Sequence, residues 1–265
     1  MKPFLKWAGN KYRIVEQIKK TLPSGGRLIE PFVGAGAVFL NTHYEKYLLA
    51  DLNADLIFLY SFLKKEGASF IQDCKLFFSS ENNNEKKFYE IRDLFNTTED
   101  SRLKSLLFVY LNKHGFNGLC RYNAAGKFNV PWGKYKKPYF PEKEMQSFYY
   151  HAKNALFGCA DFEKIMHSAC VGDVIYCDPP YVPLSETAHF TNYTAHVFGV
   201  EQQLKLASLA EALQNKGISV VISNHDTDFT RKIYAKAEIL QFQVRRFISC
   251  DGNNRLRVPE LLALF

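Results

Sequence analysis

The chain has 265 residues, of which 47% are hydrophobic, and its basic residues exceed its acidic ones by seven. This composition is typical of a globular protein with one large domain, or with one domain that carries an insertion. No apolar run approaches the roughly 18 residues that a membrane-spanning helix needs, and the opening MKPFLKWAGNK has charges where a secretory signal would be apolar. We therefore expect a cytoplasmic protein that does not enter a membrane.

The six cysteines are scattered singly along the chain, without CxxC spacing. In a cytoplasmic protein such cysteines are mostly reduced and structural. The sequence therefore predicts neither a metal site nor a disulfide.

Predicted strands and helices alternate at both ends of the chain. The periodicity predicts helices over 10–22 and 36–42, strands over 27–30 and 47–50, and a helical region from 53 to about 113. The stretch GFNGLCRYNAAGKFNVPWG predicts a β-hairpin at about 116–131, because glycine and asparagine supply its turn angles. After Pro141 the pattern predicts strands near 155–158, 174–177, 218–223, 238–246 and 258–265, and helices near 200–216 and 227–236. We predict one α/β domain with a helical, basic insertion at about 54–144.

The excess positive charge lies in this insertion. Between Ser101 and Pro141 there are eight basic residues and no acidic one, so the rest of the chain has 26 basic and 27 acidic residues. Localised basic charge interleaved with aromatic residues and glycines is typical of nucleic-acid binding. An acidic protein partner or a membrane surface remains an alternative, although the window lacks the amphipathic basic helix that membranes select.

Two strand ends are candidate ligand sites. In RLIEPFVGAGAVFL a strand enters Gly34-Ala35-Gly36, where the backbone can approach a ligand closely. No third fingerprint glycine and no P-loop lysine follow, which fits a nucleoside without a pyrophosphate. Asp51 ends the next strand, where an acid can bind ribose hydroxyls or cap a helix. In VIYCDPPY a buried strand ends at Asp178 and two prolines, which form a stiff turn.

Six motifs in order resemble the Dam-type DNA adenine-N6 methyltransferases over essentially the whole chain. They are KWAGNK (6–11), EPFVGAG (30–36), LAD (49–51), NGLCRYN (117–123), CDPPY (177–181) and SNHD (223–226). The resemblance implies a Rossmann-like methyltransferase sheet formed by 1–53 and 145–265, with a target-recognition domain at 54–144. It also implies methyl transfer from S-adenosyl-L-methionine to N6 of an adenine in double-stranded DNA, usually within GATC, leaving S-adenosyl-L-homocysteine. Asn10 stands where the family commonly has a second glycine.

The resemblance assigns catalysis to Asp178, Pro179 and Tyr181. The Asp178 carboxylate and the Pro179 carbonyl would accept hydrogen bonds from the adenine amine and aim its lone pair at the methyl group. Tyr181 would stack on the base, which must leave the duplex. By the same resemblance, the cofactor would contact Trp7, Ala8, Gly9, Lys11, Phe32, Gly34, Gly36, Asp51, Asp161, Phe162 and Asp178. No metal is expected.

The predicted hairpin contains the expected DNA-reading residues. Arg121 can bond O6 and N7 of a guanine through its planar fork, and Phe116, Asn117 and Leu119 have shapes suited to wedging into the duplex. The family often has arginine near position 134, where this chain has lysine. The full set expected at the DNA is Lys6, Phe116, Asn117, Leu119, Arg121, Asn123, Lys134, Tyr135 and Lys136. We expect a monomer with no obligate protein partner.

Further expectations concern less patterned regions. The segment 182–199 has no clear period, which predicts a mobile flap over the extruded base. Four carboxyl-terminal arginines, at 245, 246, 255 and 257, are phosphate contacts or plain surface residues.

Three other functions remain open from the residues. A cytosine-N4 or RNA adenine methyltransferase could use a similar turn, but these more often have serine or asparagine in place of Asp178. A DNA-binding module with a decayed methylase core would not need Asp51, Asp178 and Tyr181. A nucleotide-dependent oxidoreductase would need the missing pyrophosphate loop.

Overall fold

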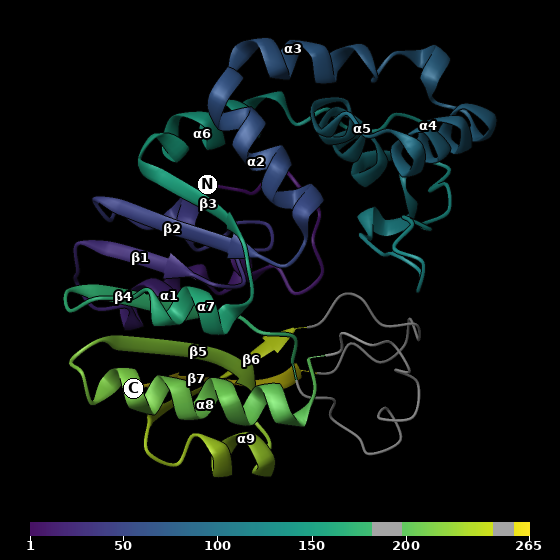
Figure 1. Ribbon diagram of the computed structural model, residues 1–265. Helices are drawn as coiled ribbons and strands as arrows, with labels where there is room; N and C mark the ends of the chain where they lie inside the picture. The colour runs from purple at the N-terminus through teal and green to yellow at the C-terminus, as the bar shows by residue number, and fades with distance from the viewer. Residues whose placement is uncertain (182–197, 246–256) are drawn as a thin grey trace. The chain divides into compact units, whose positions relative to one another are not determined.

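The computed structural model describes residues 1–181, 198–245 and 257–265 (Figure 1). The chain divides into two compact units. Unit 1 comprises Met1–Val15, Val33–His43 and Leu49–Ala160, and unit 2 comprises Glu16–Phe32, Tyr44–Leu48 and Asp161–Phe265. Among the described residues, seven strands form one sheet in the order β3-β2-β1-β4-β5-β7-β6. The predicted α/β class is therefore confirmed.

The strands of unit 2 combine parallel and antiparallel pairing. β4 (Asp173–Cys177) lies between β1 (Arg27–Glu30) and β5 (Ser219–His225) and runs parallel to both. β7 (Arg257–Leu264) pairs antiparallel with β5, and β6 (Glu238–Arg245) pairs antiparallel with β7. β4 and β5 are buried over nearly their whole length, as expected of parallel strands that are covered on both faces.

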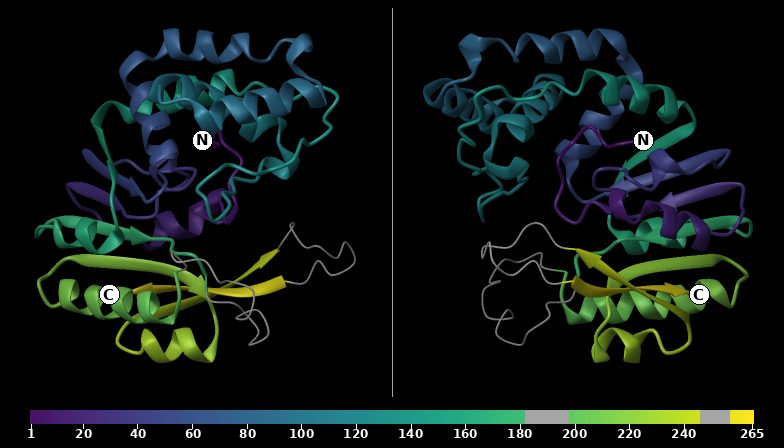
Figure 2. Two further views of the ribbon diagram at one scale, coloured as in Figure 1. Left: turned by 45° about the vertical axis from the view of Figure 1, so that its right-hand side comes forward. Right: turned by 180° about the vertical axis from the view of Figure 1, so that it is seen from behind.

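The helices of unit 2 are short, apart from α8. They are α1 (Val15–Thr21), α7 (Phe162–His167), α8 (Val200–Gln214) and α9 (Asp228–Ile233). α8 and α9 lie beside the strands β5, β6 and β7 (Figure 2). The predicted helix over 10–22 is instead a 3-10 turn, η1 (Lys11–Arg13), followed by α1. The sequence pattern did not predict α7, which is only six residues long.

Unit 1 is mainly helical. Its elements are part of β2 (Lys46–Asp51), α2 (Ala54–Glu66), α3 (Ala68–Leu76), α4 (Glu85–Thr97), α5 (Ser101–His114), α6 (Glu142–His151) and β3 (Ala155–Cys159). Side chains cap the first turns of α2, α4 and α5, because Asn53, Asn84 and Asp100 each accept a backbone N–H. α5 is buried from Ser105 onward and packs against α2, α3 and α4 (Figure 1). α6 was not predicted.

Two predicted elements differ in the structure. The predicted helix over 36–42 is a short 3-10 turn, η2 (Phe39–Asn41), because Gly34 and Gly36 adopt positive φ and leave too few residues for an α-helix. The predicted hairpin folds back on itself, but it pairs only through isolated bridges, Gly115 with Trp132 and Tyr122 with Phe128. Asn117 is left-handed and Pro131 has no N–H, so a continuous ladder cannot form.

Candidate functional site

The Asp178 carboxylate lies beside a serine hydroxyl at the end of β4. Cys177 pairs with Ile222 across β4 and β5, so the next residues along these parallel strands, Asp178 and Ser223, are neighbours. Ser223 Oγ donates to Oδ1 of Asp178 over 3.0 Å, and the hydroxyl of Tyr176 donates to Ser223 Oγ over 3.1 Å. A buried hydroxyl thus orients the carboxylate. Ser223 belongs to the SNHD motif, but no role for it was predicted.

Tyr181 is held by two residues that sequence reasoning did not assign to the site. Its hydroxyl donates to Oε2 of Glu260 over 3.2 Å. Its ring meets the His225 ring edge to face, with centroids 4.7 Å apart. His225 and Glu260 are themselves partners across β5 and β7. Burial, reinforced by the nearby Asp178 and Glu260 carboxylates, raises the pKa of Tyr181 well above its usual value, so the phenol stays protonated and can donate.

The glycine loop and Asp51 are joined directly within unit 1. The backbone N–H of Gly34 donates to Oδ2 of Asp51 over 3.1 Å, and that of Asn53 donates to Oδ1 over 3.0 Å. Burial raises the pKa of Asp51, although these backbone donors oppose the shift. Tyr60 donates its hydroxyl to the Gly34 carbonyl over 2.6 Å. The loop is therefore fixed from both sides.

The amino-terminal motif packs against the same loop. A Cβ built on Gly34 would lie 3.0 Å from the Trp7 indole, and the residue has a positive φ of 45°, so a side chain here would be crowded and strained. Lys11 is buried and donates to the Gly9 carbonyl over 2.7 Å. Asn10, the departure from the family pattern, accepts the Tyr12 N–H and caps η1. Ala8 and Gly9 are exposed.

Phe32 and Phe162 lie together in unit 2. Their rings stack with centroids 5.5 Å apart, and Phe198 packs against both at 5.4 and 5.5 Å. Phe198 belongs to the predicted flap over 182–199 and was not predicted as a separate site residue; residues 182–197 of that flap lie outside the described residues. Asp161 accepts the Glu163 N–H and caps α7, which gives it a local structural role as well.

Several residues expected at the DNA gather around Lys6 in unit 1. The Lys6 ammonium lies 4.5 Å from the centre of the Tyr135 ring, and the Tyr135 hydroxyl accepts the N–H of Asn117 over 2.9 Å. A Cβ on Gly118 would collide with the Lys6 side chain at 2.2 Å. Phe116, next to this cluster, is 48% exposed.

The Arg121 side chain is exposed and partly ordered by its own loop. Its Nε donates to Oδ1 of Asn129 over 2.8 Å. The neighbouring Asn123 accepts the N–H groups of Ala125 and Lys127, so its side chain shapes the turn. Lys134 and Lys136 are also exposed, Lys134 with a positive φ of 56°, and Leu119 is half-buried.

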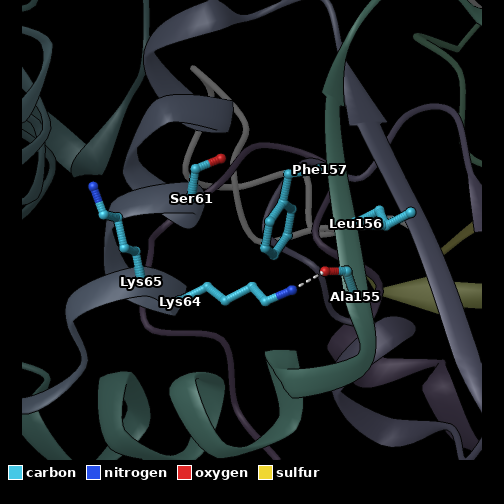
Figure 3. Close-up of a pocket in the computed structure, with 6 residues that line it drawn as sticks. All are labelled: Ser61, Lys64, Lys65, Ala155, Leu156 and Phe157. Carbon is cyan, nitrogen blue, oxygen red and sulfur yellow. Dashed lines mark hydrogen bonds between the residues drawn. The ribbon is translucent and has the colours of Figure 1, made fainter.

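One surface hollow contains none of the predicted site residues. It has a volume of about 370 Å³ and is lined by Ser61, Lys64, Lys65, Ala155, Leu156 and Phe157 (Figure 3). Lys64 already donates to the Ala155 carbonyl over 2.7 Å, so its ammonium is occupied. Among the described residues, no three histidine, cysteine or acidic side chains group as metal ligands, and no helix has the length and apolarity to cross a membrane.

Comparisons with known proteins give the family. The model of the D12 class N6 adenine-specific DNA methyltransferases matches residues 7–248. The chain is 51% identical to a DNA adenine methylase of Vibrio cholerae serotype O1, over 99% of this chain and 95% of that protein. The DNA adenine methylases of Escherichia coli K12 and Serratia marcescens are each 50% identical, over 99% of this chain and 94% and 97% of theirs. This chain therefore belongs to the D12 class of N6 adenine-specific DNA methyltransferases.

Proposed function

We propose that this enzyme moves a methyl group from S-adenosyl-L-methionine to N6 of an adenine extruded from duplex DNA, within GATC. The observation that supports the catalytic assignment best is the Asp178 carboxylate, held by Ser223 where β4 ends. Pro179 follows directly, and its fixed φ holds the preceding peptide in place.

The amino group of adenine is a poor nucleophile, because its lone pair is delocalised into the ring. Two acceptors on its two N–H bonds, the Asp178 carboxylate and the Pro179 carbonyl, would draw the nitrogen toward tetrahedral geometry. The lone pair would then point at the methyl group. Both acceptors belong to a turn that is fixed before the base arrives, so little reorganisation is needed during the reaction. The base must leave the duplex for its amine to be reached, and Tyr181 offers it a ring to stack on.

The residues around Gly34 fit the proposed cofactor. Gly34 lets Trp7 approach the loop, and the half-buried Asp51 carboxylate has acceptor capacity beyond the backbone N–H groups of Gly34, Asn53 and Leu52. These groups suit a ligand that has a ribose and an amino-acid end but no pyrophosphate. When bound, S-adenosyl-L-methionine supplies a methyl group already activated by its sulfonium. The protein's part is to position the amine for in-line attack. Phe32, Phe162 and Asp161 would hold the adenine end.

We assign recognition of the duplex to residues 54–144. The exposed Arg121 would read a guanine, and the cluster of Lys6, Asn117 and Tyr135 would lie at the target base pair. Phe116 would wedge into the stack. Lys134 and Lys136 would contact phosphates.

Methylation of a GATC-containing plasmid tests this function directly. We expect the purified enzyme and S-adenosyl-L-methionine to protect GATC sites from an endonuclease that cuts only the unmethylated sequence. The Asp178→Ala variant should give no protection, while it binds cofactor and duplex within about tenfold of wild type. Asp228→Ala, which removes an exposed carboxylate from α9, is the matched control and should protect fully. Retention of a tenth or more of the wild-type rate by Asp178→Ala would exclude the carboxylate mechanism.

A further inference from the structure

Gln203 of α8 is a buried amide whose side chain reaches the proposed catalytic turn. The residue is 1% exposed, and its Nε2 donates to the carbonyl of Pro180 over 2.8 Å. Glutamine is seldom buried without a specific partner, because desolvating an unsatisfied amide costs free energy. Here the partner is the peptide that joins the second proline to Tyr181.

The hydrogen bonds behind Gln203 have a fixed direction. A carbonyl oxygen can only accept, so the Gln203 amide must point its NH₂ group at Pro180 and its Oε1 away from it. Oε1 then accepts from Asn224 Nδ2 over 3.0 Å. Asn224 in turn presents its Oδ1 to the N–H of His225 over 2.9 Å. Gln203, Asn224 and His225 are buried, the bond to the exposed Pro180 is partly buried, and each donor faces an acceptor.

The same chain closes on Tyr181. The backbone N–H of His225 is the last donor in this series of hydrogen bonds, and the His225 ring packs against the Tyr181 ring. Tyr234 adds a lateral contact, since its hydroxyl accepts from Asn224 Nδ2 over 3.1 Å. The turn is therefore held at its peptide by Gln203 and at its aromatic ring by His225, and Asn224 joins the two supports.

We propose that Gln203 is a positioning residue for methyl transfer, acting through the Pro180 carbonyl to fix the direction of the Pro179 carbonyl and the Tyr181 ring. The peptide plane between Pro180 and Tyr181 has one main freedom once the prolines have fixed their own φ angles, and the Gln203 hydrogen bond removes it. This inference rests on the proposed roles of Asp178, Pro179 and Tyr181. A misplacement of about 1 Å at a reacting group can cost about a hundredfold in rate.

The Gln203→Glu variant tests this role most directly. It keeps the shape of the side chain and an acceptor for Asn224, but as a carboxylate it cannot donate to Pro180. Gln203→Met keeps the approximate volume and removes all three hydrogen bonds of the amide, including the one that Oε1 accepts from the Tyr234 hydroxyl over 3.4 Å. Gln214→Glu adds the same charge to an exposed position of α8 and serves as the control. Single-turnover methylation of a GATC duplex is measured at saturating S-adenosyl-L-methionine, with rates normalised to the fraction of molecules that binds DNA.

We expect both Gln203 variants to lose about tenfold or more in the single-turnover rate, with cofactor and duplex affinities within about threefold of wild type. Gln214→Glu should match wild type. A normalised rate within about twofold of wild type for Gln203→Met, which has no donor in any protonation state, would overturn the proposal, as would failure of both Gln203 variants to give folded protein, since Gln203 would then be structural only. Asp178→Ala is assayed in parallel. If Asp178→Ala stays active, the proposed catalytic mechanism is wrong. If Asp178→Ala is inactive but the Gln203 variants keep the wild-type rate, only the role of Gln203 is rejected.

Discussion

Ser223 and Asp178 are 45 positions apart in the sequence, yet Ser223 Oγ donates to Asp178 Oδ1 over 3.0 Å. The parallel register of β4 and β5 creates this contact, because each residue follows one member of the Cys177–Ile222 pair. The hydroxyl also lies 3.3 Å from the Cys177 carbonyl and accepts from the hydroxyl of Tyr176. The carboxylate therefore has a preferred orientation that does not depend on substrate.

Ser223→Ala should slow methyl transfer without preventing binding. Removal of the hydroxyl takes away one hydrogen bond that orients the Asp178 side chain, and one hydrogen bond to a charged group contributes roughly 1.5–3 kcal/mol. We expect kcat to fall by about tenfold or more, with little change in cofactor affinity. Ser69→Ala, which removes an exposed serine hydroxyl from α3, is the control. Steady-state kinetics in which Ser223→Ala and Ser69→Ala give the same kcat would show that the hydroxyl does not orient the carboxylate.

Arg121 should determine base discrimination. Its Nε and one terminal nitrogen donate to Asn129, over 2.8 and 3.4 Å, which leaves the other N–H bonds of its terminal nitrogens to approach a guanine. A bidentate contact discriminates by roughly 1–3 kcal/mol, so Arg121→Ala should slow methylation of GATC much more than methylation of a site whose guanine is replaced. Arg121→Lys keeps the charge but loses the planar fork, and it should behave similarly.

The measured quantity is the ratio of the two rates on matched oligonucleotides at one salt concentration. Lys127→Ala removes an exposed charge from the same loop and should leave this ratio unchanged. If Arg121→Lys retains the wild-type ratio, or if both rates fall equally in Arg121→Ala, the side chain contacts phosphate and the base is read elsewhere.

Binding to non-specific DNA should weaken strongly as salt rises. Several of the eight basic residues between Ser101 and Pro141 are exposed, and each phosphate they neutralise releases bound counterions. The logarithm of the affinity should fall linearly with the logarithm of salt concentration, and Lys136→Ala should reduce the slope by about one. Lys232→Ala, on α9, should not change it. A salt-independent affinity would show that the basic residues between Ser101 and Pro141 do not contact DNA.

The buried His114 should make folding stability depend on pH. Burial lowers the pKa of His114 to about 4, and its Nδ1 faces the Tyr110 carbonyl at 3.0 Å. The unfolded chain, with an ordinary histidine pKa near 6.5, therefore takes up the proton first as the pH falls. The contribution of neutral His114 to the free energy of unfolding is therefore complete above about pH 6.5 and is lost as the pH falls toward 4. Between pH 7.5 and 5 the free energy of unfolding should fall by about 2 kcal/mol.

Denaturant unfolding at these two pH values checks this difference. His114→Asn can preserve the contact to Tyr110 without a titrating ring, so its stability should change by about 2 kcal/mol less than that of wild type over the same interval. His167→Asn, at an exposed position, is the control. An equal pH dependence in wild type and His114→Asn would mean that the folded protein accommodates the charged ring.

The sequence by itself determined those features that depend only on residues close together in the sequence. Val174 to Cys177 form a strand because they are apolar, and Pro179 and Pro180 end it because they have no N–H to donate. Asn53, Asn84 and Asp100 mark helix starts for the equally local reason that their side chains accept nearby N–H groups. The α/β class and the position of the Asp178 turn followed from such signals.

The tertiary structure decided which distant groups support that turn. Ser223, Glu260 and Gln203 reach Asp178, Tyr181 and Pro180 from β5, β7 and α8. Helical spacing places Gln203 on the buried face of α8 with Leu206 and Ala207, but it does not reveal that the amide reaches Pro180. Hydrogen bonds between residues far apart in the chain depend on strand register and helix rotation, and these are fixed only when the whole sheet packs. The physical support of the turn at Asp178 is thus a property of the folded unit.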